Sequence, residues 1–245
     1  MIFCLKIYGR RYLLQHFTID IIIIMKPGPK PKGKVYIKWS SEFAYAIGLL
    51  VADGCLSKDG RHIDLTSKDL DQLTTFNNCL KINAKISRKF SGHKNLAYRV
   101  QFGDVLFYQF LQKIGLSPAK SKTISSVLIP QKYFFDFLRG YFDGDGCSYS
   151  FYDSVYAKSY RFYISFASAS IEYIKWLRNK LKIYAGVTGH VVFGKKASHI
   201  QLKYSKREAV IITEKMYYHE GVLSLKRKKL KINKSLEIIN NAVVA

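Results

Sequence analysis

The chain has 245 residues, of which 40 are Lys or Arg and 17 are Asp or Glu, so its formal net charge is +23. Hydrophobic residues make up 48% and aromatic residues 15%, which excludes a mainly disordered chain. The length is sufficient for one large domain or two small ones with their own cores. An excess of positive charge on a folded chain is typical of proteins that bind a polyanion, and it favours nucleic acid over a membrane surface.

The cysteines and the apolar runs exclude further classes. Cys4, Cys55, Cys79 and Cys147 form no C-x-x-C pair, so neither a zinc framework nor a disulfide framework is indicated, and a reducing compartment fits. The longest apolar run, Ile21–Met25, is far shorter than the roughly 20 residues that a membrane span needs. We therefore expect no transmembrane helix and no membrane partner.

The first 34 residues differ from the rest of the chain. Residues 1–24 lack the long apolar core and the small-residue cleavage site of a signal peptide. Residues 26–34 read Lys-Pro-Gly-Pro-Lys-Pro-Lys-Gly-Lys, in which Pro and Gly disfavour helix and strand and the lysines keep the segment solvated. We interpret residues 1–34 as a weakly ordered extension with a basic arm, for which Met25 is an alternative start. An organellar presequence is the minor alternative.

The remainder contains an internal repeat. Residues 43–55 and 135–147 both end in Asp-Gly-Cys, and further matches follow in the same order along each copy. Leu-Lys-Ile at 80–82 recurs at 181–183, for example. We predict a first repeat over residues 35–128 and a second over residues 129–245.

Each copy predicts the same elements in chain order. A helix ends at each Asp-Gly, with Ser40 or Ser41 as the cap of the first and Pro130 at the start of the second. Gly54 and Gly146 are expected to let the chain turn out immediately afterwards. Alternating and amphipathic patterns then predict strands at 62–66, 85–90, 98–102, 161–166, 190–193 and 199–204, and helices at 70–80 and 171–181. The prediction is an α+β fold of two αββαββα repeats, with helices behind each sheet and a wet face in front.

Small residues four positions apart mark one face of each motif helix. Glycine inside a helix costs up to about 1 kcal/mol relative to alanine, so a compensating contact is expected. Close packing of the two helices through these faces would supply it. The residues concerned are Gly48, Ala52, Gly140 and Gly144.

That packing would bring Asp53 and Asp145 together at two negative helix ends, where the carboxylates repel each other. A divalent cation would reverse the sign, and hard oxygen ligands suit Mg²⁺. An EF-hand is excluded, because Ser148 and Ser154 stand where its loop requires Gly and Glu. A purely structural pair of helix ends is the alternative.

On these motifs the chain resembles the LAGLIDADG homing endonucleases. The first motif is Ala-Ile-Gly-Leu-Leu-Val-Ala-Asp-Gly at 46–54, and the second is Leu-Arg-Gly-Tyr-Phe-Asp-Gly-Asp-Gly at 138–146. The second is close to the family pattern, whereas Val51 replaces the earlier acidic residue in the first. The resemblance covers about residues 35–235 and points to the single-chain, pseudo-dimeric branch. It implies a saddle of two four-stranded antiparallel sheets on DNA, and Mg²⁺-dependent cleavage of both strands across the minor groove.

The resemblance also implies roles for individual residues. Asp53 and Asp145 become the ligands of Mg²⁺, or of another divalent cation such as Mn²⁺, assisted by the backbone carbonyls of Ala52 and Gly144. The basic catalytic residue and the water-positioning residue are assigned in both copies. The catalytic residues are Lys120 and Lys226, with Lys122 and Lys228 as alternatives two positions on, and the water-positioning residues are Ser67 and Ser168, both short for that task.

The polar faces of the predicted strands are the candidate readers of base edges, because a two-stranded ribbon fits the major groove. The basic run Lys226–Lys234 is expected to contact phosphates instead. The candidate readers are His62, Asp64, Thr66, Arg88, Arg99 and Gln101 in the first copy, and Arg161, Tyr163, His190, His199, Gln201 and Lys203 in the second.

We therefore predict an intron-encoded, site-specific endonuclease that acts as a monomer on a long asymmetric site in double-stranded DNA. The main alternative is an RNA-splicing maturase that binds its own intron RNA, or a catalytically silent DNA- or RNA-binding protein of the same fold. An intein-borne endonuclease and a transcription regulator are further alternatives. The presence of both aspartates favours the endonuclease. The expected location is an intracellular, reducing compartment with access to DNA, and microbial cytoplasm or nucleoid is preferred to an organelle matrix.

Overall fold

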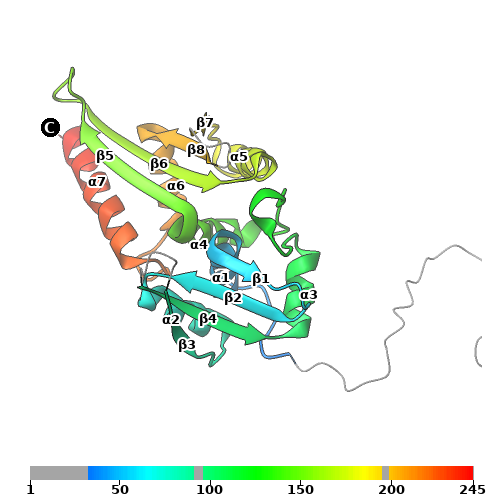
Figure 1. Cartoon of the computed structure of the whole chain (residues 1–245). Coiled ribbons are helices and arrows are strands. Elements are labelled where there is room, and N and C mark those ends of the chain that lie inside the picture. The colour runs from blue at the N-terminus through cyan, green and yellow to red at the C-terminus, as the bar shows by residue number, and fades with distance from the viewer. Residues whose placement is uncertain (1–32, 91–95, 195–198, 245) are drawn as a thin grey trace, which may run out of the picture. The chain divides into compact units, whose positions relative to one another are not determined.

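The computed structural model describes residues 33–90, 96–194 and 199–244, with side chains up to Asn241. The predicted extension and most of the basic arm, residues 1–32, lie outside the described residues. Two similar units follow each other along the rest of the chain, each with the predicted order of helix, two strands, helix, two strands and helix (Figure 1). Within the described part, no helix combines the length and apolarity needed to cross a membrane.

The elements agree with the predicted segments to within a few residues. The first unit consists of α1 (Ser41–Asp53), β1 (Gly54–Leu56), β2 (His62–Ser67), α2 (Leu70–Leu80), β3 (Ile86–Phe90), β4 (Leu96–Gly103), α3 (Val105–Lys113) and the 3-10 turn η1 (Lys120–Lys122). The second consists of the 3-10 turn η2 (Gln131–Tyr133), α4 (Phe134–Asp145), β5 (Gly146–Tyr152), β6 (Tyr160–Ser168), α5 (Ile171–Ala185), β7 (His190–Phe193), β8 (Ile200–Ser205), α6 (Lys206–Met216) and α7 (Lys226–Val244). Helix α7 has no counterpart in the first unit, and the predicted repeat boundaries stay a prediction.

Different signals start the two motif helices. The Oγ of Ser40 accepts the backbone N–H of Phe43 at 3.1 Å, so Ser40 is the N-cap of α1 as predicted. Pro130 instead precedes the 3-10 turn η2, and α4 begins only at Phe134. The fixed φ of proline therefore starts a tighter turn that leads into the helix.

Both motif helices end at a glycine from which a strand begins without a loop. The φ angles of Gly54 and Gly146 are −81° and −87°, so neither glycine adopts the left-handed conformation expected of a helix-ending glycine. Their role is steric. A Cβ at Gly54 would lie 2.5 Å from the carbonyl oxygen of Leu50, and one at Gly146 would lie 2.5 Å from that of Phe142.

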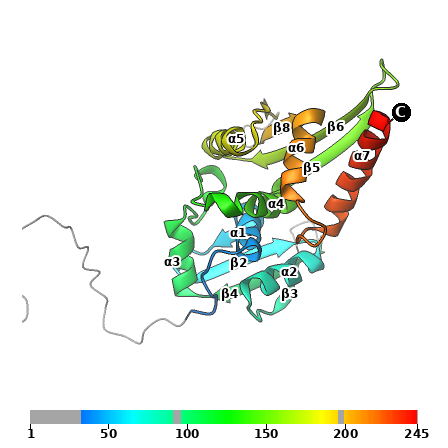
Figure 2. The same cartoon turned by 180° about the vertical axis from the view of Figure 1, so that it is seen from behind.

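Each unit contains a four-stranded antiparallel sheet, ordered β1-β2-β4-β3 in the first and β5-β6-β8-β7 in the second. Helix α2 packs on β2 and β4, while α5 and α6 pack on β6 and β8 (Figure 2). Ile63 and Leu65 of β2 are buried beneath the helices, and the alternate residues are part-exposed on the other face. We call this second face of each sheet its open face.

Helices α1 and α4 pack backbone to backbone through the predicted small residues. A Cβ at Gly48 would lie 2.2 Å from the carbonyl oxygen of Phe137, and one at Gly140 would lie 2.0 Å from that of Tyr45. Around this contact, every residue of α1 from Phe43 to Val51 is buried. The expected glycine-mediated contact is confirmed, and it joins the two units.

We predict that Gly140→Ala destabilises the protein by about 3 kcal/mol, because its methyl group overlaps the backbone of α1 and the two helices must separate. Urea unfolding measures this change. Gly221→Ala is the matched control, since a Cβ there meets nothing closer than 3.6 Å, and we expect a change within about 0.5 kcal/mol. Equal stability of both variants would contradict the close packing.

Candidate functional site

Asp53 and Asp145 are the last residues of the two packed helices. The small residues before them bring the helix ends together: a Cβ at Gly144 would lie 2.3 Å from the Cβ of Ala52 and 2.9 Å from Oδ2 of Asp53. Both aspartates remain exposed to solvent on one side. Among the described residues, no hydrogen bond contributes to the electrostatics of either carboxylate.

Partial burial disfavours the ionised form of both carboxylates. Desolvation, together with repulsion from Asp145, raises the pKa of Asp53 to about 6, while Lys228 and Lys120 oppose this shift. Desolvation also raises the pKa of Asp145 above its ordinary value, against the same two lysines. The pair is therefore an anionic centre whose charge is only partly compensated by the protein.

One lysine lies at the end of each motif helix. The Nζ of Lys120, in η1, donates to the carbonyl oxygen of Gly54 at 2.5 Å. The Nζ of Lys228, in α7, donates to the carbonyl oxygens of Phe142, Gly144 and Gly146 at 2.7, 3.0 and 2.7 Å. Desolvation lowers the pKa of both lysines. These ammonium groups offset the negative helix ends and lie near the carboxylates without binding them.

The second lysine of the site is not Lys226, the residue predicted from the sequence. Lys226 is exposed and lines a separate groove with Tyr45, Asp71 and Gln72, so the structure does not bring it to the aspartates. Two residues correspond to about 200° around a helix, so Lys226 and Lys228 lie on opposite sides of α7. The structure therefore places Lys228, the alternative two positions on, and not Lys226 beside the aspartates. Lys122, the alternative in the first copy, is exposed, whereas Lys120 is buried at the site.

Asp143, in α4, connects this motif helix to the segment that carries Lys228. Its Oδ2 accepts the hydroxyl of Tyr45 and the backbone N–H of Leu225, both at 2.7 Å. The carbonyl oxygen of Leu225 in turn accepts the N–H of Lys228 at 2.9 Å in the first turn of α7. Asp143 therefore fixes the start of the helix that carries Lys228. Val51 occupies the corresponding position in α1, and the sequence signalled this difference without revealing its function.

A buried ion pair secures the segment between α6 and α7. Nη2 of Arg139 lies 2.7 Å from Oδ1 of Asp136, which also accepts the Tyr218 hydroxyl at 2.9 Å. Nε of Arg139 donates to the carbonyl oxygen of Leu223 at 2.6 Å. The guanidinium thus holds the chain that leads into α7, a role that the sequence did not indicate.

Arg227 joins α7 to the first unit. Its Nη2 lies 2.9 Å from Oδ2 of Asp69, and its Nε contacts both carboxylate oxygens at 3.2 Å. Asp69 is the N-cap residue of α2, and its side chain makes no cap hydrogen bond to that helix. The pair therefore connects the second unit's last helix to the first unit next to Lys228.

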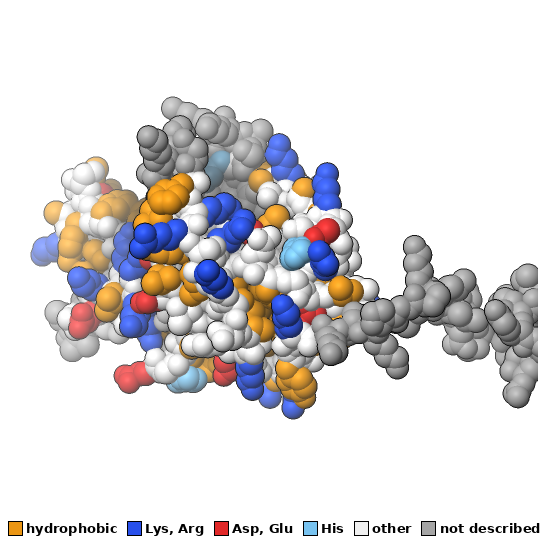
Figure 3. All heavy atoms as spheres, turned by 60° about the horizontal axis from the view of Figure 1, so that its bottom comes forward, with side chains coloured by type: hydrophobic (Ala, Val, Ile, Leu, Met, Phe, Trp, Pro, Cys, Tyr) orange, Lys and Arg blue, Asp and Glu red, His pale blue; other side chains and the backbone are white. Residues whose placement is uncertain are grey.

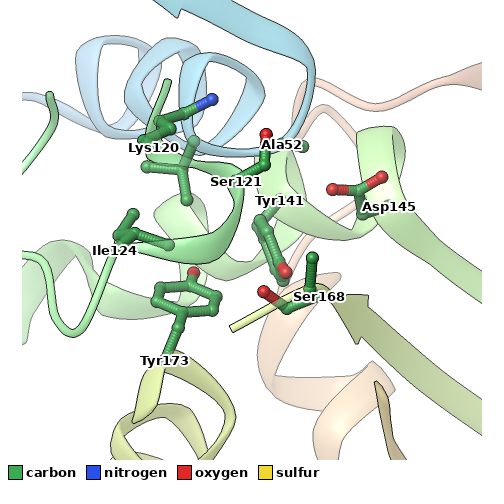
Figure 4. A pocket seen from close by; sticks show the side chains of 10 residues that line it. Ala52, Lys120, Ser121, Ile124, Tyr141, Asp145, Ser168 and Tyr173 are labelled. Carbon is green, nitrogen blue, oxygen red and sulfur yellow. The ribbon is translucent and has the colours of Figure 1, made fainter. Parts of the chain in front are cut away.

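A small pocket of about 60 Å³ opens beside Asp145 and Lys120, with Tyr141 and Ser168 in its wall (Figure 4). The hydroxyl of Tyr141 donates to the carbonyl oxygen of Ala167 at 2.5 Å. Ser168, a predicted water-positioning residue, lines the same pocket as Asp145.

Ser67 and Ser168 also have a shared local role. Each Oγ accepts the backbone N–H two residues on, from Asp69 at 3.0 Å and from Ser170 at 3.1 Å, and so shapes the turn before α2 or α5. Ser67 additionally donates to Oε1 of Gln72 at 2.6 Å. Its hydroxyl is therefore engaged in protein contacts, and the water-positioning role stays a prediction for both serines.

The strand register places eleven of the twelve predicted base readers on the open faces. Arg88 is the exception, because it pairs with Tyr98 and faces the helix side of the sheet. Lys89, which is not among the predicted readers, lies on the open face, and its Nζ contacts Oγ1 of Thr66 at 3.3 Å. The open-face readers are His62, Asp64, Thr66, Arg99, Gln101, Arg161, Tyr163, His190, His199, Gln201 and Lys203.

Basic side chains are widely distributed over the surface. Figure 3 shows one face of the molecule, over which Lys and Arg side chains are widely spread. The few acidic side chains of the open faces are partly neutralised, as at Asp64, whose Oδ2 lies 3.6 Å from Nη1 of Arg99. A protein with this excess of positive charge is suited to bind a polyanion.

Neither a family model nor a curated protein matches this chain. Solved structures do match. The fold is that of the LAGLIDADG homing endonucleases. I-GzeII in complex with its DNA target has a TM-score of 0.57 at 12% identity, covering 83% of this chain and 92% of that one. I-WcaI bound to its DNA recognition sequence has a TM-score of 0.55 at 14% identity, with 80% and 88% covered.

The same fold occurs in another kind of protein. Full-length DUF199/WhiA from Thermatoga maritima matches with a TM-score of 0.53 at 15% identity over 84% of this chain. The present chain spans 62% of the length of that structure. These matches confirm the predicted α+β fold with two four-stranded antiparallel sheets.

The donor set at the helix ends suits a divalent cation of the Mg²⁺ type. The described residues contain no group of three or more His, Cys, Asp or Glu able to hold a metal ion. Mg²⁺ usually takes only one or two carboxylates and completes its shell with water and phosphate oxygens. Asp53 and Asp145 supply two such carboxylates, and the carbonyls of Ala52 and Gly144 precede them, although Gly144 already accepts Lys228. These ligand roles stay predictions.

We predict that Asp53→Asn stabilises the metal-free protein at pH 8 by about 1 kcal/mol, a value discounted for solvent screening on the open side. The pKa of Asp53 in the folded state, about 6, lies above its ordinary value of 3.8, so ionisation opposes folding as the pH rises through this window. The advantage of the variant should therefore diminish below pH 6 and vanish near pH 4. Urea unfolding of the variant and the parent, with a chelator and at several pH values, measures this difference in stability. A difference that does not change with pH would contradict the raised pKa of Asp53.

Proposed function

We propose that this protein is a site-specific DNA endonuclease that makes Mg²⁺-dependent double-strand breaks at a long, asymmetric target. The observation that supports this best is the juxtaposition of Asp53 and Asp145 with Lys120 and Lys228 at the ends of two packed helices. The fold is consistent with it, since I-WcaI and I-GzeII share that fold and are bound to DNA targets.

The chemistry follows from the groups at this centre. A divalent cation, when bound, lowers the pKa of a water molecule and neutralises charge that develops on a phosphate. Asp53 and Asp145 hold the cation through their carboxylate oxygens. The Nζ groups of Lys120 and Lys228 stabilise the additional negative charge of the transition state, and their lowered pKa values make them suitable for proton transfer.

The two halves of the chain suit the two strands of a duplex. One polypeptide supplies both motif helices, both sheets and both lysines, so we propose that it acts as a monomer and that each lysine serves one strand. The open faces bind the major groove on either side of the cleavage site. Intron homing inside a compartment that holds DNA is the biological role we propose for such cleavage.

We predict that Asp145→Asn lowers cleavage by more than about 100-fold, because a carboxylate that holds the cation is lost. The assay uses a library of intron-insertion sites with Mg²⁺ or with chelator, and binding is measured in Ca²⁺. Asp71→Asn, which makes the same change at an exposed position of α2, is the matched control and should cleave like the parent.

Two outcomes would contradict parts of this proposal. Wild-type-like cleavage by Asp145→Asn would leave the endonuclease activity in place but remove Asp145 from its chemistry. Binding without any cleavage by the parent chain, in Mg²⁺ and on every site tested, would instead favour the silent binding protein or the maturase.

We predict that Lys228→Met lowers cleavage by about 100-fold, whereas Lys226→Met changes it less than about threefold, because only the first removes a cation from the active centre. The two variants have the same formal charge, so their difference isolates position from charge. Thermal unfolding should accompany the assay, since Lys228 also satisfies three carbonyl oxygens. A larger effect at Lys226 would overturn the assignment of Lys228 to the active centre.

A further inference from the structure

The open faces of the two sheets differ in chemistry. In the first sheet the open face carries charged and polar side chains, such as Asp64, Thr66, Lys89, Arg99 and Gln101. In the second sheet an aromatic cluster occupies the corresponding surface of β5 and β6. The cluster consists of Tyr149, Phe151 and Tyr163.

The rings of the aromatic cluster stand parallel to one another. The centroids of Tyr149 and Tyr163 lie 5.0 Å apart with an interplanar angle of 20°, and those of Phe151 and Tyr163 lie 6.1 Å apart at 22°. The Nζ of Lys203, on β8, lies 4.3 Å from the Tyr163 centroid and 4.9 Å from that of Tyr149. The centroids of Tyr149 and Phe151 lie 6.4 Å apart at 3°, so the three rings form a compact triangle that stacking and cation–π attraction hold together.

The cluster is open to solvent although it is apolar. Phe151 is 47% exposed, even though Tyr149 and Tyr163 lie against its ring. Val192, 38% exposed, adds a further apolar side chain to the open face at the opposite edge of the sheet, beside Gln201. An apolar surface of this kind, within an otherwise basic face, indicates a binding partner with both phosphates and exposed apolar groups.

Duplex DNA offers such apolar groups in the major groove, where thymine presents its C5-methyl and no other base presents one. Unpaired bases would need free ring faces on which to stack. In the cluster, however, Tyr149 and Tyr163 cover each other and Lys203 lies over both rings, so much of the ring faces is occupied. The ring edges remain available, and they suit contact with methyl groups.

We infer that the aromatic cluster selects thymine-containing sequence in one half of the DNA target, through apolar contact with thymine methyl groups in the major groove. This inference rests on the proposed function and adds to it a base preference that only one half-site has. Among the described strand residues of the first sheet, no aromatic side chain lies on the open face, so its half-site is read mainly by hydrogen bonds and charge.

The test removes methyl groups without changing base pairing. The full chain first selects its target from a randomised duplex library in Ca²⁺. Deoxyuridine then replaces thymidine in one half-site at a time, and binding is measured for the parent, Phe151→Ser and Tyr152→Ser. Tyr152 is the matched control, because it is the next residue of β5, is 57% exposed and faces the other side of the sheet.

We expect deoxyuridine to weaken binding in one half-site by about fourfold per contacted methyl group, which corresponds to ~0.8 kcal/mol, and by less than about twofold in the other. Phe151→Ser should abolish much of this sensitivity, and Tyr152→Ser should retain it. Equal sensitivity in both halves, or sensitivity unchanged in Phe151→Ser, would overturn the inference. Tighter binding to single-stranded DNA than to the duplex would also overturn it.

The same experiment separates this inference from the proposed function. Failure to enrich any duplex would contradict the proposed function, and with it the base preference. An enriched duplex that is cleaved in Mg²⁺ but is indifferent to its thymine methyl groups would contradict the base preference alone.

Discussion

The backbone contact between α1 and α4 is the constraint on which the rest of the structure depends. Gly48 and Gly140 leave no room for side chains, since a Cβ at Gly140 would lie 2.0 Å from the carbonyl oxygen of Tyr45. Helices packed this closely must end side by side, so Asp53 and Asp145 meet whatever their mutual repulsion. A strand follows each helix end directly, and both sheets are therefore positioned from this one contact.

The electrostatics of the centre follow from what the two lysines bind. Lys120 and Lys228 donate to backbone carbonyls at the ends of the two motif helices and at the starts of the strands that follow. They are thus close enough to oppose the raised pKa values of Asp53 and Asp145, yet they leave the carboxylate oxygens free. An ion pair in the same place would have neutralised the site. The observed arrangement keeps an anionic pair available within a strongly basic protein.

The sequence was sufficient for features encoded locally or by the repeat. Glycine spacing predicted the helix contact, and alternating patterns predicted most strands. Features that depend on contacts between distant segments were not accessible. Lys228 could be distinguished from Lys226 only once the start of α7 was known. That start is fixed by a hydrogen bond to Asp143, which lies 82 residues earlier in the chain. Arg88 was misplaced because the face of β3 depends on its pairing with β4.

The departures from symmetry gather in the second unit, and they affect the surfaces to which we assign target binding. Lys120 is carried by a short 3-10 turn between the units, whereas Lys228 lies on a long helix that Arg227 connects back to Asp69 of the first unit. The aromatic cluster is likewise confined to the second sheet. A homodimer would present identical binding surfaces to the two halves of a duplex. Two repeats in one chain are free to differ from each other, so the asymmetric target that we propose is compatible with the near-symmetric centre.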